Sequence, residues 1–119
     1  MEKWIACGGN VMVGDVVDWP EPIRVNKGKR KKKLVTIGDQ HVTASVTRLE
    51  GKEWVHLTVL ECVIKDVRQA RPLTPLRKGA AVKRKRTTLA RGDARRLPWA
   101  GRDGEAVRAR LAISSKFLE

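Results

Sequence analysis

Residues 41–64 read HVTASVTRLEGKEWVHLTVLECVI and contain two runs in which apolar and polar side chains alternate. This period of two is typical of a β-strand that buries one face. Gly51 and Lys52 separate the runs, and a short turn there would let the second run return antiparallel to the first. The expected inward-facing residues are Val42, Ala44 and Val46 in the first run and Val55, Leu57 and Val59 in the second. We therefore expect a β-hairpin at the centre of the fold.

A shorter strand-like segment opens the chain. Residues 11–19 (VMVGDVVDW) are rich in β-branched side chains, and Gly14 with Asp15 is expected to form a kink or bulge within the strand. Pro20 and Pro22 follow at once. Because proline has no N–H to donate to a neighbouring strand, these two residues predict a turn or an edge position.

Residues 34–37 predict a further strand, ended by a turn at Gly38 and Asp39. With the segments above and a short strand resumed at residues 23–25, this makes about five short strands in the first sixty or so residues. A meander of that size usually curls into a small barrel. The predicted fold class is therefore mainly β: a small antiparallel five-stranded barrel over residues 1–66, with a basic loop at 24–33.

The rest of the chain has a different character. Residues 67–102 are punctuated by proline and glycine, so they predict a basic extended arm or linker, within which residues 80–90 are compatible with a helical turn or two. Residues 103–119 predict a C-terminal amphipathic helix with Val107, Leu111 and Phe117 on its apolar side. Two roles stay open for this helix: packing on the barrel, or forming a surface for a protein partner or a second subunit.

Positive charge is concentrated in two segments of this chain, whose net charge is +13. Residues 24–33 (RVNKGKRKKK) carry seven Lys and Arg, residues 67–92 carry nine, and neither segment contains an acidic residue. Concentrated charge of this kind is expected of a surface that meets a polyanion, and nucleic-acid phosphates are the commonest one. The predicted nucleic-acid-binding residues are Arg24, Lys27, Lys29, Arg30, Lys31, Lys32, Lys33, Arg77, Lys78, Lys83, Arg84, Lys85, Arg86 and Arg91.

The aromatic residues bear on the kind of nucleic acid. The chain has no tyrosine and one phenylalanine, and none of its four tryptophans lies in a basic run. Proteins that bind single strands usually stack bases on aromatic side chains beside basic ones. The sequence therefore favours duplex DNA held through phosphate contacts. Trp54 is the tryptophan most expected to be exposed on a strand.

Catalytic and cofactor motifs are absent from the sequence. There is no HExxH, GxSxG, GxxxxGK[ST] or GxGxxG pattern, and the acidic residues Asp15, Asp18 and Glu21 have no histidine beside them. The two cysteines and two histidines are scattered along the chain rather than spaced as metal ligands: Cys7, His41, His56 and Cys62. We expect no enzyme activity, no metal and no cofactor.

The opening residues, MEKWIACGGN, lack the pattern of a signal peptide, and no window approaches the roughly 18 apolar residues of a membrane span. A cytoplasmic location is expected, associated with the nucleoid if the chain binds DNA. In its small size, its basic charge and its frequent Arg, Ala and Val residues, the chain resembles accessory proteins of bacterial plasmids and phages.

The segment Val13-Gly14-Asp15-Val16-Val17 resembles the first strand of SH3-like small barrels, including KOW and Tudor-type modules, in which a Gly-Asp pair starts the sheet. The resemblance covers residues 11–64 at most. It implies an SH3-like barrel, with an OB-like barrel as the alternative, and such barrels bind DNA, RNA or proteins. A long lysine-rich segment stands where KOW modules have a short turn.

Three hypotheses follow from the sequence. The first is a non-catalytic DNA-binding accessory protein that contacts phosphates. The second is an RNA- or ribosome-associated protein that uses the same charges. The third is a protein-binding inhibitor or adaptor, in which the C-terminal helix supplies specificity and could also form a homodimer.

Overall fold

The structure is a computed structural model that describes residues 4–26, 34–67 and 73–118. About half of the described chain is β-strand. The elements, in chain order, are β1 (Ile5–Ala6), β2 (Val16–Asn26), β3 (Leu34–Glu50), β4 (Trp54–Val67), β5 (Ala81–Lys85), α1 (Arg86–Arg91), β6 (Arg95–Arg96) and α2 (Gly104–Leu118).

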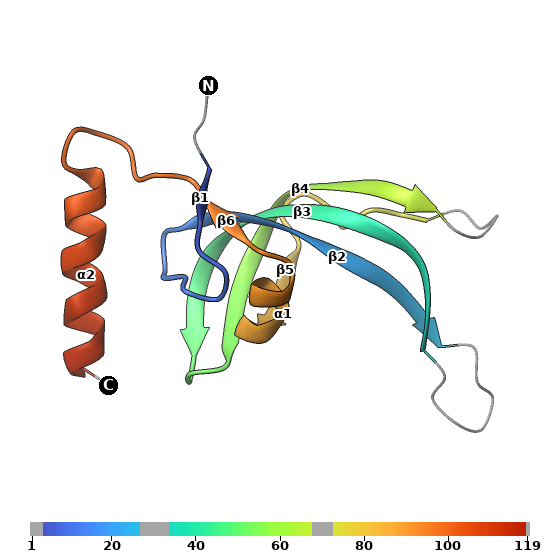
Figure 1. Cartoon of the computed structure of the whole chain (residues 1–119), viewed down its shortest axis with the longest axis horizontal. Coiled ribbons are helices and arrows are strands. Elements are labelled where there is room, and N and C mark those ends of the chain that lie inside the picture. Colours follow the sequence, from blue (N-terminus) through green and yellow to red (C-terminus); the bar gives the residue numbers. More distant parts are fainter. Residues whose placement is uncertain (1–3, 27–33, 68–72, 119) are drawn as a thin grey trace.

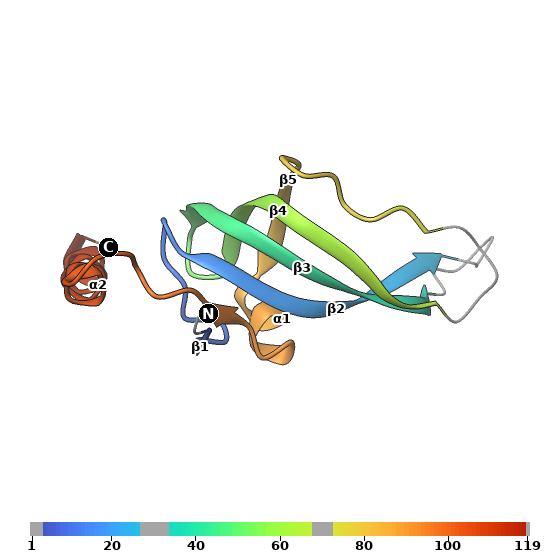
Figure 2. The same cartoon turned by 90° about the horizontal axis from the view of Figure 1, so that it is seen from above.

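The strands form one antiparallel sheet in the order β1-β6-β2-β3-β4-β5. The mainly β fold is confirmed, but in the described residues the sheet has six strands and is not closed into a barrel. Figure 1 shows the long strands curving around α1, while α2 stands to one side of the sheet. Figure 2 shows the same separation of α2 from the strands when the molecule is seen from above.

The core lies on the concave face of the sheet. Trp19 of β2 and Leu89 of α1 are fully buried there, and the inward-facing residues of the central hairpin pack with them. All six residues that the sequence placed on the inner face of the hairpin are buried: Val42, Ala44, Val46, Val55, Leu57 and Val59. The alternation in the sequence thus identified the core of the sheet correctly.

The hairpin is longer than expected. β3 runs continuously from Leu34 to Glu50, so the turn predicted at Gly38 and Asp39 does not form. Gly38 is buried within the strand, where a Cβ atom would overlap the backbone carbonyl oxygen of Asp66 on β4. The glycine therefore permits close approach of two strands beside a bulge, rather than a change of chain direction.

The N-terminal prediction also needs correction. β2 begins at Val16, and Gly14 lies in the preceding turn with φ of 99°, so Gly14 and Asp15 do not form a bulge inside a strand. Pro20 and Pro22 lie within β2, opposite β3. On the other side β2 pairs with β6 only at Val17 and Asp18, so the two prolines occupy an edge, one of the two positions that the sequence allowed.

The largest difference concerns residues 67–102, predicted as an extended arm. Within this stretch β5 pairs with β4, β6 lies between β1 and β2, and α1 covers the core through Leu89. Strand β5 has few apolar residues, and it forms because every one of its residues pairs with a residue of β4. In the described part of this stretch, residues 73–80 and 97–102 form irregular connections.

The C-terminal helix α2 is present, and within it Val107 and Leu111 expose 37% and 45% of their surface. The side chain of Phe117 lies outside the described part of the chain. Among the described residues, no helix is both long and apolar enough to cross a membrane.

Candidate nucleic-acid interface

A cleft of about 520 Å³ opens between the free edge of β2 and helix α1. It lies where the curved sheet fails to close, because β5 and α1 approach β2 without pairing with it. Basic residues from both charged segments meet here: Arg24 from the first, and Arg84 and Arg91 from the second. The full lining is Pro20, Glu21, Pro22, Arg24, Asp39, Arg84, Thr88, Arg91 and Gly92.

Local sequence explains why the cleft stays open at this edge. Pro20 and Pro22 cannot donate a hydrogen bond to a further strand, so β2 has no partner beyond Asp18 on this side. Gly92 ends α1 against the same edge, where a Cβ atom would lie only 2.7 Å from the Pro20 carbonyl oxygen. A side chain at position 92 would push α1 away from β2.

Arg84 forms part of the cleft wall and is committed to a structural ion pair. Its Nε and Nη2 atoms donate to the two carboxylate oxygens of Glu21, each at 2.9 Å. Glu21 is only 8% exposed and also accepts hydrogen bonds from Trp19 Nε1 at 3.0 Å and Gln40 Nε2 at 2.8 Å. Burial acts to raise the pKa of Glu21, but the hydrogen bonds from Arg84, Trp19 and Gln40 outweigh it and hold the pKa below its ordinary value.

Arg24 and Arg91 are in a different state. Both are exposed, and within the described ranges neither side chain has a hydrogen-bond or ion-pair partner. Guanidinium groups match phosphate oxygens with two parallel N–H donors, so two unpaired arginines at one cleft suit a phosphate group. The half-buried Thr88 adds a hydroxyl to the same lining.

The remaining cations of the second segment are divided between paired and open positions. Arg86 donates to the carbonyl oxygen of Gly9 at 2.8 Å and so ties the start of α1 to the N-terminal loop. Arg77 and Lys78 are exposed in the turn before β5. The predicted binding residues Lys27, Lys29, Arg30, Lys31, Lys32 and Lys33 lie outside the described residues.

Lys83 and Lys85 point away from the cleft, because side chains alternate along β5 and Arg84 faces inward. They flank Trp54 of β4, with Nζ atoms 4.6 Å and 5.3 Å from the ring centroid. Lys83 also pairs with Glu50 at 2.8 Å, and this hydrogen bond lowers the pKa of Glu50. Strand geometry therefore places Lys83 and Lys85 on one face of β5 and Arg84 on the other, while the last residue of the KRKR motif, Arg86, begins α1.

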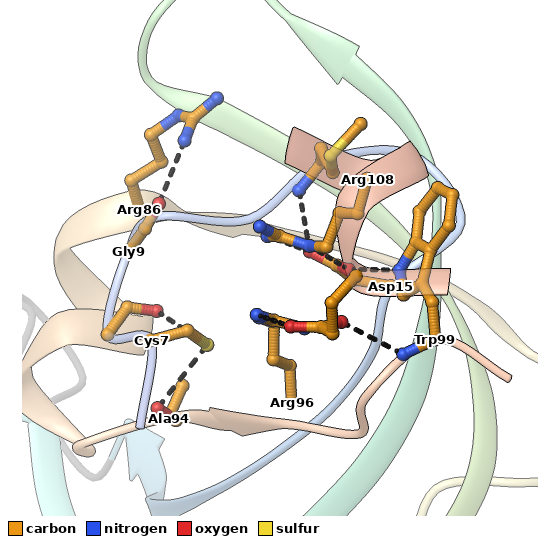
Figure 3. A network of polar contacts seen from close by, with 11 residues as sticks. Cys7, Gly9, Asp15, Arg86, Ala94, Arg96, Trp99 and Arg108 are labelled. Carbon is orange, nitrogen blue, oxygen red and sulfur yellow. Dashed lines mark hydrogen bonds and ion pairs between the residues drawn. The ribbon is translucent and has the colours of Figure 1, made fainter. Parts of the chain in front are cut away.

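A second polar network was not predicted from the sequence (Figure 3). Asp15 is fully buried and accepts hydrogen bonds from Arg108 Nε at 2.8 Å, Arg108 Nη2 at 2.7 Å, Trp99 Nε1 at 2.8 Å and the Met12 N–H at 2.9 Å. Burial acts to raise the pKa of Asp15, but these hydrogen bonds outweigh it and lower the pKa. The network fixes the first turns of α2 to the loop before β2.

Arg96 and Glu105 complete the attachment of α2. Arg96 Nη1 and Nη2 donate to the Glu105 carboxylate at 2.9 Å and 2.6 Å, and the Trp99 N–H donates to it at 3.0 Å. The hydrogen bond from Arg96 is the main cause that lowers the pKa of Glu105 to about 2. Beside this network, burial raises the pKa of the Cys7 thiol, whose Sγ lies 3.4 Å from the Ala94 carbonyl oxygen (Figure 3).

The three acidic residues near the start of β2 share one role. Each pairs with an arginine from the C-terminal half: Asp15 with Arg108, Asp18 with Arg95, and Glu21 with Arg84. Their even spacing of three residues, in a segment facing a basic C-terminal half, was the available sequence signal. In the parts of the chain that the structure describes, no three His, Cys, Asp or Glu side chains gather as a metal site.

No known protein family, curated protein or solved structure matches this chain. Function is therefore inferred from the side chains described above.

Proposed function

We propose that this chain is a non-catalytic nucleic-acid-binding accessory protein that holds phosphates at the cleft between β2 and α1. The observation that carries the proposal is the meeting of Arg24 and Arg91 at one cleft, both exposed and without a partner among the described residues. They come from the two acid-free segments, which are 67 positions apart at these residues. A cleft that gathers unpaired cations from distant parts of the chain suits a polyanion better than a chance surface charge does.

The sequence next to Arg24 adds further positive charge. Arg24 lies two residues before Asn26, the last residue of β2, and Lys27 directly follows it in the chain. Six of the seven basic residues of 24–33 therefore follow β2 directly in the sequence. Lysines need only charge complementarity to contact phosphate, and arginines add directional hydrogen bonds, so the two kinds of residue can act together on one backbone.

Duplex DNA is the proposed ligand, with structured RNA as the alternative that uses the same contacts. Binding through phosphates is independent of sequence and depends steeply on salt, because each neutralised phosphate releases counterions. A protein that makes six to ten such contacts loses roughly a thousand-fold or more in affinity between about 50 and 200 mM salt. Competition between duplex DNA and structured RNA at equal phosphate concentration distinguishes the two ligands.

The decisive experiment compares two double variants of equal charge. Fluorescence polarisation of labelled duplex DNA is measured across the salt range for Arg24→Ala/Arg91→Ala and for Arg102→Ala/Arg110→Ala, a control pair of exposed arginines near α2. Loss of two phosphate contacts should reduce the slope of log affinity against log salt by about 2 for the cleft variant alone. Equal effects of the two variants would show that total charge, not the cleft, governs binding.

We also infer that the fold is an opened relative of the SH3-like small barrel, with an OB-like barrel as the alternative. The Gly14-Asp15 turn before β2 agrees with the resemblance, and Arg84 of β5 reaches across to Glu21 of β2, where a closed barrel would have strand pairing. Helix α1 occupies that opening. In this interpretation the proposed phosphate cleft is the place where the barrel is left open.

A protein-binding role for α2 is the second candidate. The network around Asp15 and Glu105 holds the first turns of the helix, where Val107 and Leu111 are exposed one turn apart. An apolar pair presented on a fixed helix suits a protein partner or a second copy of the chain. This role can coexist with nucleic-acid binding at the cleft.

A further inference from the structure

The outer face of the sheet carries an aromatic side chain flanked by cations. Trp54 begins β4 and pairs in register with Lys85 of β5, while Lys83 pairs with His56 one step further along the same face. The two lysine Nζ atoms lie 4.6 Å and 5.3 Å from the Trp54 ring centroid. This arrangement is invisible in the linear sequence, because the tryptophan and the lysines are about thirty residues apart.

The surroundings leave this ring accessible. Trp54 is half-buried, the lysine side chains are 43% and 47% exposed, and Ala81 next along β5 is small and exposed. Glu50 lies 2.8 Å from Lys83 and Glu53 lies 3.6 Å from Lys85, so the carboxylates steer the ammonium groups toward the ring. Exposed ion pairs of this kind are weak, and lysine is flexible, so both ammonium groups can leave the ring at little cost.

We propose that Trp54 stacks an unpaired base, while Lys83 and Lys85 move from the ring to the flanking phosphates. The inference deepens the proposed function and rests on it: the preferred ligand is a duplex that continues into a single-stranded portion, which Trp54 contacts. A flat aromatic ring with basic neighbours on an open sheet is the usual platform for unpaired bases. The sequence argument against single strands relied on missing aromatic and basic neighbours, and the pairing of β4 with β5 supplies those neighbours.

Structural stabilisation is the competing explanation for this cluster. Cation–π contacts and ion pairs across β4 and β5 could serve only to hold the edge strand in place. That explanation predicts that loss of the Trp54 ring lowers stability but leaves any preference for unpaired bases unchanged. The two explanations thus differ in ligand preference rather than in affinity alone.

The test uses two labelled DNAs that share one duplex: a blunt form, and a form with a single-stranded thymidine tail of about ten nucleotides, within the usual span of such sites. The full chain is compared with Trp54→Leu and with Trp4→Leu, a control tryptophan whose ring also carries a cation, Arg95 at 5.2 Å. Circular dichroism and urea unfolding establish that each variant is folded. Quenching of tryptophan emission by free oligothymidine is measured in parallel.

The expected result is tighter binding of the tailed DNA by roughly tenfold, and loss of that gain in Trp54→Leu alone. The quenching should disappear with it, while affinity for blunt duplex stays the same. Equal affinity of the full chain for both DNAs would overturn the inference and leave the proposed duplex binding standing. The same conclusion would follow if the tighter binding of tailed DNA survived in Trp54→Leu, or if it were lost equally in Trp4→Leu. If only the tailed DNA is bound, in a Trp54-dependent way, the inference holds and the duplex proposal fails. If neither DNA is bound, both fail.

Discussion

Arg84→Ala separates the structural arginines of this protein from those proposed to bind phosphate. Sequence alone groups Arg84 with the nucleic-acid-binding residues, since it lies in the KRKR motif. In the structure its guanidinium makes two 2.9 Å hydrogen bonds to Glu21, a carboxylate that is 8% exposed. We therefore expect this variant to lose stability first, and to lose affinity only in proportion to its change in net charge.

The size of the effect follows from the burial of the partner. Removing one member of a buried ion pair costs about 3–5 kcal/mol, because the other charge is left uncompensated. Glu21 keeps its hydrogen bonds from Trp19 and Gln40, and the Arg84 side chain is 25% exposed, so the lower end, about 3 kcal/mol, is expected. For a domain with about 5–15 kcal/mol of stability this is a large fraction.

Urea unfolding followed by tryptophan fluorescence measures the loss, with Arg91→Ala as the matched control that removes an exposed arginine from the same cleft. The control should stay within about 0.5 kcal/mol of the parent. Because the pKa of Glu21 is held below its ordinary value of 4.5, the stabilisation is complete above about pH 4.5 and is lost as the pH falls through the lowered pKa. The gap between parent and Arg84→Ala should therefore narrow in acid.

The reasoning would be refuted by an Arg84→Ala protein that unfolds within about 0.5 kcal/mol of the parent while its salt slope for DNA becomes smaller. That result would mean that the guanidinium leaves Glu21 and contacts phosphate in solution. Replacing Glu21 by Gln in both backgrounds completes a double-mutant cycle. A coupling energy near zero in that cycle would also count against a structural pair.

Two other predictions concern α2. Glu105 has a pKa of about 2 against an ordinary 4.5, so its ion pair with Arg96 should be intact above about pH 4.5 and be lost as the pH falls toward 2. A carbon-13 titration of the Glu105 carboxyl should show this low pKa, and Glu105→Gln should abolish this contribution to the acid dependence of stability. Val107→Ser/Leu111→Ser should leave the unfolding midpoint and DNA affinity within error, because both side chains are exposed, and a change in sedimentation coefficient of the parent relative to this variant would assign the helix to self-association.

The sequence was most informative where the structure depends on neighbours along the chain. The alternation in residues 41–64 placed both strands of the hairpin and its buried face, because the side-chain period of a strand is a local property. It was least informative for β5 and β6. In β5 only Val82 and Ala81 are apolar, and the strand exists because β4 offers hydrogen-bond partners to it. Local patterns cannot reveal a strand that is specified by its neighbour.

The candidate site shows the same division. Arg24 and Arg91 were both predicted to bind nucleic acid, but their meeting at one cleft depends on α1 docking against the edge of β2 through Gly92. Residues that act together here are far apart in the chain. Trp54 was expected to be exposed, yet its lysine neighbours arise only through cross-strand pairing. The sequence identified the basic residues and the exposed tryptophan, and tertiary contacts determine which of these side chains are free to contact a nucleic acid.

The acidic residues of the N-terminal segment determine that availability. Asp15, Asp18 and Glu21 each accept two hydrogen bonds from one arginine, and the three carboxylates are 0%, 3% and 8% exposed. Arginines held in this way are poor phosphate ligands, because leaving would strand a buried carboxylate without a counter-charge. These three arginines are therefore not available to a nucleic acid, although they are among the 26 Lys and Arg residues of the chain. If binding follows the proposed cleft, the measured salt slope should correspond to fewer phosphate contacts than the sixteen basic residues of the two acid-free segments. Arg84 is one of the sixteen, so a slope that matches all of them would mean that its ion pair with Glu21 opens on binding.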